Sequence, residues 1–404
     1  MSFQQGLSGL NAAAKALDVT SNNVANTSTV GYKASAAQFQ DVYAASLGGA
    51  GASQIGIGTQ VAQVAQQFTQ GNITITSNPL DIAINGAGFF RMSDNGTISY
   101  SRNGQFNVDK DGYIVNAAGL RLTGFPADPN GIVVPATPAD LLINSSDLQP
   151  SATTSVETGV NLDSRVADPS VVPFNPNNPL TYNSSTSVTV FDSLGNPHVM
   201  TMYFVKDPAP AVRQWTVHAS MDGGAITSNT LNFNTNGALT TAMPLAAITF
   251  PVTSGASNIV ATLDFSGTTA FGSTFGVNRM SQNGYTSGQL SGVAIGADGL
   301  VQGRYSNGRS RNMGQVVLAN FNNAGGLTSI GANQWTESAN SGTPLIGAPG
   351  SASLGAIQSG AVEDSNVDLT AELVNMITQQ RTYQANAQSI RTQDQILQTL
   401  VNLR

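Results

Sequence analysis

Apolar residues at the C-terminal end of the chain recur at alternating steps of four and three residues. Residues 367–404 contain no glycine or proline, although the chain holds 42 glycines. This heptad spacing predicts a long helix that lies along another helix, with Ser365 opening a capping box at its start. The apolar positions of the series are Leu369, Leu373, Met376, Tyr383, Ala387, Ile390, Leu397 and Val401.

The N-terminal end carries a second series with the same alternation of steps. Its positions are Leu7, Leu10, Ala14, Leu17, Ser21 and Val24. Together the two series predict a helical core domain, made of residues 1–30 with 361–404, in which the terminal helices pair as a coiled coil. Two independent surface helices on a globular body are the alternative that the spacing leaves open.

The residues between these ends alternate apolar and polar side chains over short stretches, which predicts strands. From Leu80 onward the stretches are separated by turn sequences such as Asn95-Gly96, because Asn-Gly supplies the positive φ angles of tight hairpins. The expected fold is therefore multidomain and mainly β, with long terminal helices and two nested β domains. The expected ranges are 31–70 for a connecting segment, 71–147 with 284–360 for an inner β domain, and 148–283 for an inserted outer β domain.

Charged residues are scarce in this chain. Asp, Glu, Lys and Arg make up 10% of it, against about 25% in typical soluble domains, as expected if much of the surface packs against copies of itself. The net charge of -7 argues against nucleic acid, which needs a basic surface. No stretch is apolar enough to span a membrane, cysteine is absent, and the N-terminus lacks the pattern of a secretory signal peptide. These features alone predict a cytoplasmic protein.

The sequence offers few groups for catalysis. Both histidines, His198 and His218, lie in predicted strands, and a structural role is favoured for each. The motifs of a nucleophile elbow, a phosphate-binding loop and a zinc protease do not occur, so we expect no enzyme, cofactor or metal site. The stretch from Asp109 to Gly112 begins like a calcium loop but lacks the later ligands, and a hairpin turn is predicted there.

Several stretches resemble the axial proteins of the bacterial flagellum, the family of rod and hook proteins. Residues 80–106 are similar to the first β motif of that family, and residues 372–384 are similar to its C-terminal motif. Residues 190–206 resemble the outer domain of hook proteins, whereas rod proteins are shorter and lack this insertion. The N-terminal signature of the family is matched within residues 21–33, at Asn22, Asn23, Asn26, Gly31 and Lys33.

The resemblance implies a structural subunit that self-assembles into the flagellar hook, a curved flexible tube acting as a universal joint that transmits torque from rod to filament. Its implied partners are further copies of the chain, the hook cap protein, the distal rod protein, the hook-filament junction protein and the flagellar type III export apparatus. It also implies an extracellular location, in the hook, reached without a cleaved signal peptide. That implication replaces the cytoplasmic location drawn from composition.

The helical seams are the expected assembly interface, because they form the largest apolar surface available. We expect contacts there both within a subunit and between neighbours, through Leu7, Leu10, Leu17, Val24, Leu369, Leu373, Met376, Ile377, Tyr383, Ile390, Leu397 and Val401. Two other functions stay open on the sequence. One is a distal rod protein, which the insertion argues against, and the other is a secreted carbohydrate-binding β protein.

Overall fold

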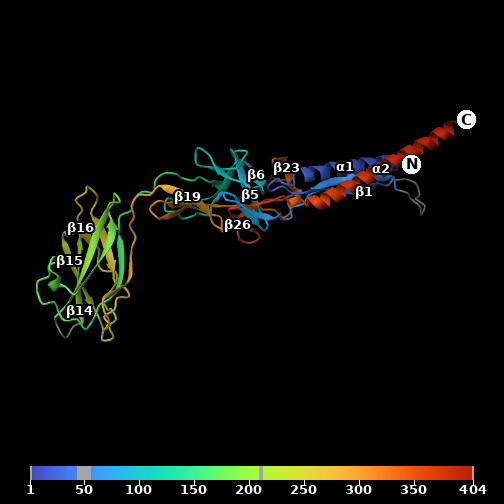
Figure 1. Cartoon of the computed structure of the whole chain (residues 1–404). Helices are drawn as coiled ribbons and strands as arrows, with labels where there is room; N and C mark the ends of the chain where they lie inside the picture. Colours follow the sequence, from blue (N-terminus) through green and yellow to red (C-terminus); the bar gives the residue numbers. More distant parts are fainter. Residues whose placement is uncertain (1, 43–55, 209–212, 403–404) are drawn as a thin grey trace. The chain divides into compact units, whose positions relative to one another are not determined.

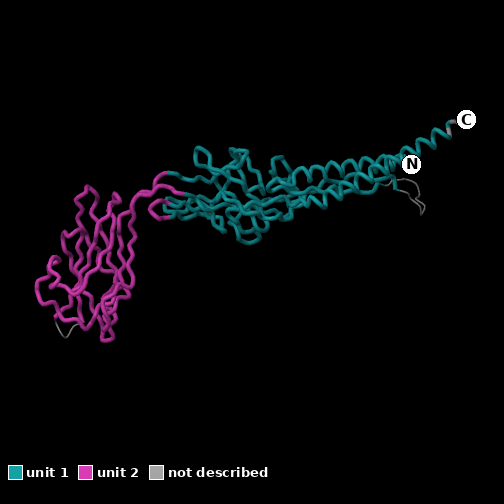
Figure 2. The backbone as a smooth tube through the Cα atoms, in the orientation of Figure 1, with its two compact units in different colours: residues 1–145, 292–304, 310–404 teal, residues 146–291, 305–309 magenta. Residues whose placement is uncertain are grey.

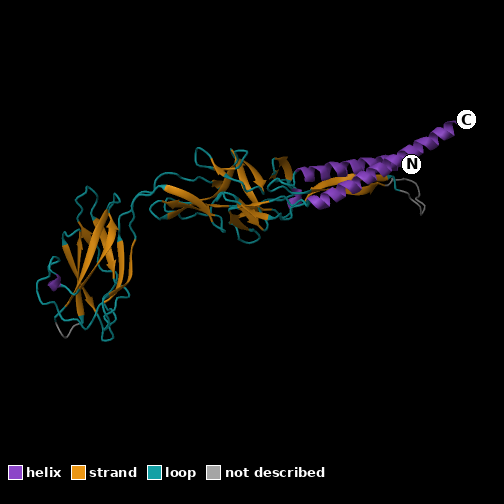
Figure 3. Ribbon diagram, viewed as in Figure 1, coloured by secondary structure: helices purple, strands orange, loops and turns teal. Residues whose placement is uncertain are grey.

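The computed structural model describes residues 2–42, 56–208 and 213–402. These residues belong to two compact units, one of residues 1–145, 292–304 and 310–404 and the other of residues 146–291 and 305–309 (Figure 2). The first unit contains a helix from each end of the chain together with β structure, and the second is built mainly of strands (Figure 3). The expected fold class, mainly β with long terminal helices, is confirmed.

The terminal helices lie side by side and run in opposite directions (Figure 1). They are α1 (Ser2–Ala25) and α2 (Leu369–Asn402). Near the start of α1, a Cβ placed on Gly6 would lie 3.1 Å from Cγ1 of Ile390. Near the end of α1, Asn23 Nδ2 donates a hydrogen bond of 3.2 Å to Glu372 Oε1. The longer helix α2 therefore continues past the beginning of α1.

A β-hairpin packs beside α1 in the first unit. Its antiparallel strands are β1 (Ser35–Val42) and β2 (Gly58–Gln66). Thr59 N at the start of β2 donates to Ser8 Oγ of α1 at 3.3 Å. The range 31–70, expected as a connecting segment, thus forms long paired strands where it is described. Its residues 43–55 lie outside the described residues.

The rest of the first unit is β structure. A sheet of 13 strands has the order β19-β20-β21-β9-β5-β6-β24-β23, with β7, β8, β10, β22 and β25 paired beside this path. Two small antiparallel sheets pair β26 with β4 and β27 with β3, which joins late segments of the chain to early ones. The bounds are β3 (Ile73–Ile75), β4 (Ile82–Asn85), β5 (Phe89–Asp94), β6 (Thr97–Ser101), β7 (Asn107–Val108), β8 (Ile114–Val115), β9 (Arg121–Pro126), β10 (Ala139–Asp140), β19 (Leu290–Ile295), β20 (Leu300–Tyr305), β21 (Ser310–Val316), β22 (Leu318–Asn320), β23 (Thr328–Gly331), β24 (Gln334–Thr336), β25 (Leu345–Gly347), β26 (Ala356–Ser359) and β27 (Ala361–Glu363).

Two of the turns predicted from the sequence illustrate why the strands end where they do. Asn95 has a φ of 48° and Gly96 a φ of 99°, and the pair joins β5 to β6 as a two-residue hairpin loop. Asp109 Oδ1 accepts hydrogen bonds from the backbone N of Asp111 at 2.9 Å and of Tyr113 at 2.8 Å. The stretch at Asp109 is therefore the hairpin turn that was expected in place of a calcium loop.

An aromatic cluster forms part of the core of the first unit. Phe68 packs edge-on against Phe89, with ring centroids 5.3 Å apart, and against Trp335 at 5.4 Å. Trp335 is buried, and its indole N–H donates to Gln66 at the end of β2. Because edge-to-face packing stabilises aromatic pairs beyond the area they bury, the cluster fastens the hairpin segment to the β strands.

The second unit is a sandwich of two four-stranded sheets, with the orders β12-β13-β14-β15 and β16-β17-β11-β18. Along β13 every second side chain, Met200, Met202 and Phe204, is fully buried, and Phe204 meets Phe265 with ring centroids 6.1 Å apart. This alternation is the period of a strand with one face in a core. The bounds are β11 (Ser155–Asn161), β12 (Ser184–Phe191), β13 (Pro197–Lys206), β14 (Gln214–Met221), β15 (Ile226–Asn232), β16 (Ile248–Phe250), β17 (Ile259–Asp264) and β18 (Gly276–Gln282).

Candidate assembly surface and the junction beneath it

The contact face of α1 is a line of small and polar residues. Gly6 lies against Ile390, and a Cβ on Gly9 would lie 2.9 Å from Nδ2 of Asn386. Because the distance between packed helices depends on the side chains at the contact, these glycines allow α1 and α2 to approach closely. The line, at steps of three and four residues, is Gly6, Gly9, Ala13, Ala16, Thr20 and Asn23.

This line corrects the predicted seam of α1 by one residue. Leu7 is 44% exposed, and Leu10, Leu17 and Val24 are only partly buried. On the α1 side, the contacts with α2 at Gly6, Gly9 and Asn23 are made by small or polar residues, whereas the sequence predicted large apolar ones there. The residues of α1 that are placed against α2, Gly6, Gly9 and Asn23, each lie one position before a residue of the predicted series, whereas Ile390 of the predicted α2 series lies against Gly6.

The predicted residues of α2 divide into two groups. Met376 and Ile390 are partly buried, on the line that also holds Glu372 and Asn386. The large apolar side chains that α2 leaves exposed are Leu369, Leu373, Val374, Ile377, Tyr383, Ile396, Leu397 and Val401. Leu7 and Phe3 of α1 are also exposed, and these residues together are the exposed apolar side chains of the helix pair.

The start of α2 differs from the predicted capping box. Asp368 is the N-cap residue, because its Oδ1 accepts from the backbone N of Thr370 at 2.9 Å and of Ala371 at 3.1 Å. Ser365 instead accepts from Val367 N at 3.3 Å, before the helix begins. A carboxylate at this position also interacts favourably with the helix dipole.

The signature residue Asn23 joins three segments of the first unit and is buried. Its Nδ2 donates to Ser35 O at 2.8 Å and to Glu372 Oε1 at 3.2 Å, and its Oδ1 accepts from Ser35 N at 2.9 Å. Tyr32, whose hydroxyl donates to Asn23 Oδ1, also accepts from Asn22 Nδ2. Asn23 therefore ties the end of α1 to the hairpin and to α2.

Gly31 allows a close approach that no other residue permits. Its φ is 70°, and a Cβ there would lie 2.5 Å from the backbone N of Asn103. Gly31 N donates to Glu363 O at 2.7 Å. The segment after α1 is thereby held against the inner strands and against β27.

Three buried charges lie next to this approach. Lys33 Nζ donates to Glu363 Oε1 at 2.6 Å and to Thr69 O at 2.7 Å, and Arg102 donates to Glu363 Oε2 at 3.0 Å. The side chains of Lys33 and Glu363 are fully buried, and that of Arg102 is almost so. Gly71 N also donates to Glu363 Oε1 at 2.8 Å. One carboxylate therefore holds two cations, from the N-terminal segment and from the inner β structure.

Burial governs the titration of both cations. It lowers the pKa of Lys33 below its ordinary value, and the nearby Glu363 carboxylate opposes the shift without cancelling it. The pKa of Arg102 is lowered for the same reason and opposed by the same partner. Glu363 therefore offsets part of the desolvation free energy of each buried cation. Removal of Glu363 would leave both positive charges without a counter-ion.

Sequence reasoning found Lys33 and missed its partners. Arg102 lies inside the β motif that was recognised, but nothing local marked it as buried. Glu363 is 330 residues from Lys33, in a short stretch with three acidic residues. One feature of the sequence could have indicated that Glu363 is buried. Glu363 ends the strand-like run Ala361-Val362-Glu363, and a charged residue is unusual in such a run.

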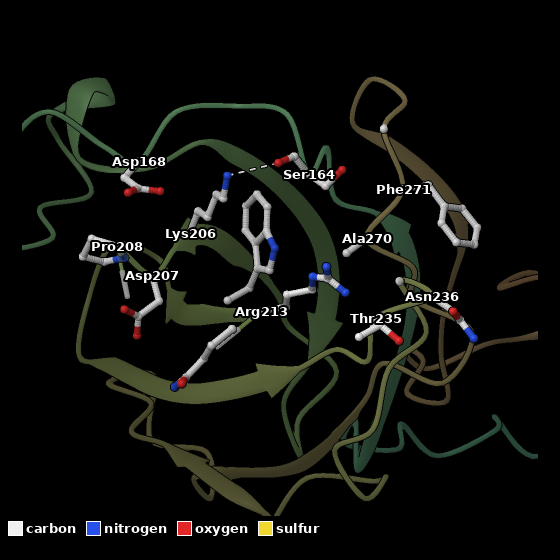
Figure 4. A pocket seen from close by; sticks show the side chains of 14 residues that line it. Ser164, Asp168, Lys206, Asp207, Pro208, Arg213, Thr235, Asn236, Ala270 and Phe271 are labelled. Carbon is white, nitrogen blue, oxygen red and sulfur yellow. Dashed lines mark hydrogen bonds between the residues drawn. The ribbon is translucent and has the colours of Figure 1, made fainter. Parts of the chain in front are cut away.

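The second unit contains a hollow of about 630 Å³ (Figure 4). Lys206 and Arg213 line it together with two aspartates, and Lys206 Nζ is already used in a hydrogen bond of 3.1 Å to Ser164 O, drawn in Figure 4. The residues that line it include no histidine to act as a base beside a hydroxyl. Over the described ranges, no group of three His, Asp or Glu side chains is placed to hold a metal ion.

Both histidines of the second unit contact side chains of the same unit. His218 Nδ1 and Ser228 Oγ are 2.6 Å apart, and the imidazole stacks on Phe174 with ring centroids 4.0 Å apart. His198 lies between two aspartates. Neither geometry places a histidine beside a nucleophile in the hollow.

A pair of terminal helices with exposed apolar residues, carried on polar β units, defines a structural protein that acts by association. Family models match along the chain. They describe a flagella basal body rod protein (residues 3–33), a flagellar hook protein FlgE/F/G D1 domain (83–147), a flagellar basal body protein FlaE D2 domain (161–285) and a flagellar basal body rod FlgEFG protein C-terminal region (358–403).

Full-length relatives give the same assignment. The chain is 44% identical over 414 residues to the flagellar hook protein FlgE of Escherichia coli, covering 100% of both chains. It is 33% identical over 443 residues to the flagellar hook protein FlgE of Borreliella burgdorferi, covering 100% of this chain and 99% of that one. The chain belongs to the flagellar hook protein FlgE family. It is a structural subunit of the flagellar hook.

A solved structure supports the fold. The flagellar hook protein FlgE2 of Helicobacter pylori superposes with a TM-score of 0.56 at 15% identity, covering 72% of this chain and 100% of that chain. The full-length relatives favour the hook over the two alternatives, a distal rod protein and a carbohydrate-binding protein. None of the helices in the described ranges has a stretch long and apolar enough to cross a bilayer.

Proposed function

We propose that this chain polymerises through the exposed apolar surface of its helix pair to form a curved flexible tube. In that tube residues 1–30 and 361–404 form the inner wall, residues 71–147 with 284–360 an inner β layer, and residues 148–283 an outer β layer. The assembled tube acts as a universal joint that transmits torque from rod to filament.

The observation that carries the proposal is the apolar end of α2. Gly6 of α1 lies opposite Ile390, and both helices rise by about 1.5 Å per residue. Residues of α2 after Asp394 therefore have no residue of α1 opposite them, since α1 begins at Ser2. Figure 1 shows this end of α2 extending past the start of α1. Ile396, Leu397 and Val401, which lie after Asp394, are exposed.

An apolar stripe of this kind is stabilised by burial against another helix. Burying each such side chain contributes about 1.5–3 kcal/mol, and an isolated single helix of this polar composition is marginal in water. Within the described residues the chain supplies no partner for the overhang. Neighbouring copies, each presenting Leu7 and Leu373 exposed, supply apolar partners of the same kind.

The β surfaces support the proposed joint. With only 10% of the chain charged, contacts between copies there rely on Ser, Thr, Asn and Gln side chains. Individual polar contacts of this kind contribute little each and are readily exchanged for water. Surfaces held by many weak contacts can change partners as the tube bends, whereas the helical wall stays fixed.

A tube of this kind has a base and a tip, and other proteins must bind at each of them. We infer contacts with the hook cap protein during growth, the distal rod protein at the base and the hook-filament junction protein at the tip. Delivery through the flagellar type III export apparatus, without a cleaved signal peptide, would place the assembled tube outside the cell. Export of a reporter carrying residues 1–30 from cells with and without this apparatus tests the route.

The substitution Leu397→Asp tests the polymerisation surface. A buried unpaired carboxylate in the helical wall is costly, so the purified variant should keep the circular dichroism of the parent and form no tubes in electron micrographs. Gln395→Asp is the matched control, because two residues are about 200° apart around a helix and Gln395 lies away from Leu397. Normal tubes from Leu397→Asp, or equal loss in both variants, would contradict the proposed role of the stripe.

A further inference from the structure

His198, at the start of β13, lies between two carboxylates of the second unit. Its Nδ1 is 2.7 Å from Asp222 Oδ2, and its Nε2 is 3.3 Å from Asp192 Oδ2. Asp192 is fully buried, His198 is mostly buried, and Asp222 is about half exposed. The two carboxylates belong to different turns, one between β12 and β13 and the other after β14.

Both contacts can be hydrogen bonds only when the imidazole is charged. A neutral imidazole has one N–H, and its other nitrogen presents a lone pair, which a carboxylate repels. With the imidazolium, both nitrogens donate. Partial burial lowers the pKa of His198, but the hydrogen bonds to Asp222 and Asp192 outweigh it, so that the net pKa is raised.

The two aspartates are held in place independently of the histidine. Asp222 Oδ1 accepts from Val199 N at 2.8 Å, and the residue has a φ of 49°, a conformation fixed by the turn. Asp192 Oδ1 accepts from the backbone N of Leu194 and of Asn196, each at 2.9 Å. The segment after β16 that borders His198 contributes the hydroxyl residue Thr253 and no charge. These two carboxylates are therefore the charged groups that face the imidazole.

This cluster joins the two sheets at one end of the sandwich. Ser254, which follows β16 of the other sheet, donates from Oγ to Asp192 Oδ2 at 3.0 Å, and Ser257 N donates to Ser193 Oγ at 3.0 Å. A Cβ on Gly195 in the same turn would lie 2.8 Å from Pro150. The turn that His198 holds is thus in contact with both sheets and with the segment that leads into β11.

We propose that His198 is a pH-sensitive clamp that closes this end of the second unit when protonated and releases it when neutral. In the neutral state the imidazole keeps its shorter contact, to Asp222, and loses the one to Asp192. The β12–β13 turn then loses its link through the imidazole to Asp222, the residue that follows β14. The clamp is a property of this unit alone and does not depend on how the subunits assemble.

The sign of the pH effect follows from the raised pKa. The folded unit binds a proton on His198 more tightly than the unfolded chain, whose imidazole titrates near pH 6.5. The stabilisation is therefore complete below about pH 6.5 and is lost as pH rises through the higher folded value. Aspartate protonation would also remove the clamp, but only in strong acid, because the pKa values of Asp192 and Asp222 are lowered.

The first test follows unfolding of the second unit by Trp215 fluorescence in the full chain carrying Trp335→Phe. The chain has two tryptophans, so this background reports the second unit alone. Between about pH 6 and about pH 9 its melting temperature should fall by roughly 2–4 °C. His198→Gln should abolish the fall, whereas His218→Gln, in the same sheet, should retain it. A fall that persists in His198→Gln would overturn the clamp.

The second test titrates His198 by nuclear magnetic resonance. In the parent it should titrate above about pH 6.5, and in Asp222→Asn its pKa should drop, because one carboxylate partner has become neutral. This measurement is made on the folded protein and does not depend on the stability of His198→Gln. Titration of His198 at or below its ordinary pKa, or no change in Asp222→Asn, would also overturn the proposal.

Discussion

The substitution Glu363→Gln tests the buried junction beneath the helix pair. Glutamine has nearly the shape of glutamate and can still accept hydrogen bonds, so the change removes mainly the charge. Lys33 and Arg102, both buried and both bonded to Glu363, would then lack a counter-charge. The variant should keep the fold of the second unit and destabilise the first.

The expected size follows from the burial of all three groups. Removing one partner of a buried ion pair costs about 3–5 kcal/mol, because the remaining charge stays desolvated. A unit of this size loses roughly 2–4 °C of melting temperature per kcal/mol. The first unit should therefore melt on the order of 10 °C lower than in the parent.

The assay uses the tryptophan of the first unit. In the full chain carrying Trp215→Phe, the buried Trp335, whose indole bonds to Gln66 of β2, reports the first unit only. Thermal unfolding of Glu363→Gln in this background gives the shift directly. The complementary background, Trp335→Phe, should show no shift for the second unit.

Two comparisons separate charge from general damage. Asp140→Asn breaks the partly exposed pair with Arg121 in the same unit and should change the melting temperature little, because exposed pairs contribute little. Adding Lys33→Met to Glu363→Gln should recover part of the loss, since one uncompensated cation is removed. A melting temperature of Glu363→Gln within about 2 °C of the parent, or no recovery in the double variant, would show that Glu363 does not stabilise the two buried cations.

Two further predictions concern single residues. Gly31→Ala should destabilise the first unit by at least about 2 kcal/mol, because alanine adds positive-φ strain and a backbone clash. The control Gly119→Ala should cost less, because Gly119 has a φ of 81° but open space around it. Equal losses of unfolding free energy in chemical denaturation would contradict this prediction. Burial lowers the pKa of His218, so the unfolded chain takes up its proton first and stability should fall as pH drops below about 6.5. In the Trp335→Phe background, His218→Gln should reduce that acid-side loss, and an unchanged slope would count against it.

The β structure was largely predictable because its signals are local. Alternation of apolar and polar residues marks strands, and Asn-Gly pairs such as Asn95-Gly96 mark the turns that join them. The range 31–70, expected as a connecting segment, contains the longer strands β1 and β2. Its strands, SAAQFQDV and GTQVAQVAQ, place small alanines among the larger apolar residues and leave both faces exposed or half-buried, so the alternation that marks a strand with one buried face is weak.

The residues of α1 that lie against α2 differ from the predicted series for a physical reason. Hydrophobic periodicity selects the line with the largest apolar residues, whereas α1 contacts α2 through glycine and alanine, as at Gly6 and Gly9. In a chain that pairs only with itself the largest apolar residues would be buried first. The exposure of Leu7 and Leu397 is consistent with the proposed contacts between copies.

The buried junction was out of reach of sequence reasoning. A charged residue ordinarily lies at the surface. Glu363 is buried because it pairs with Lys33 and Arg102, which are 330 and 261 residues away in the sequence. Periodicity contains no information on such pairings. The family signature included Gly31 and Lys33. It did not include Glu363, whose carboxylate binds Lys33 and Arg102.

The central claim is that neighbouring copies bury the apolar end of α2. A helical reconstruction of the assembled tube by electron cryomicroscopy tests it most directly. We expect Ile396, Leu397 and Val401, all exposed in the single chain, to be covered by helices of adjacent copies. A tube in which this end of α2 stays open to solvent, with the copies joined only through their β units, would contradict it.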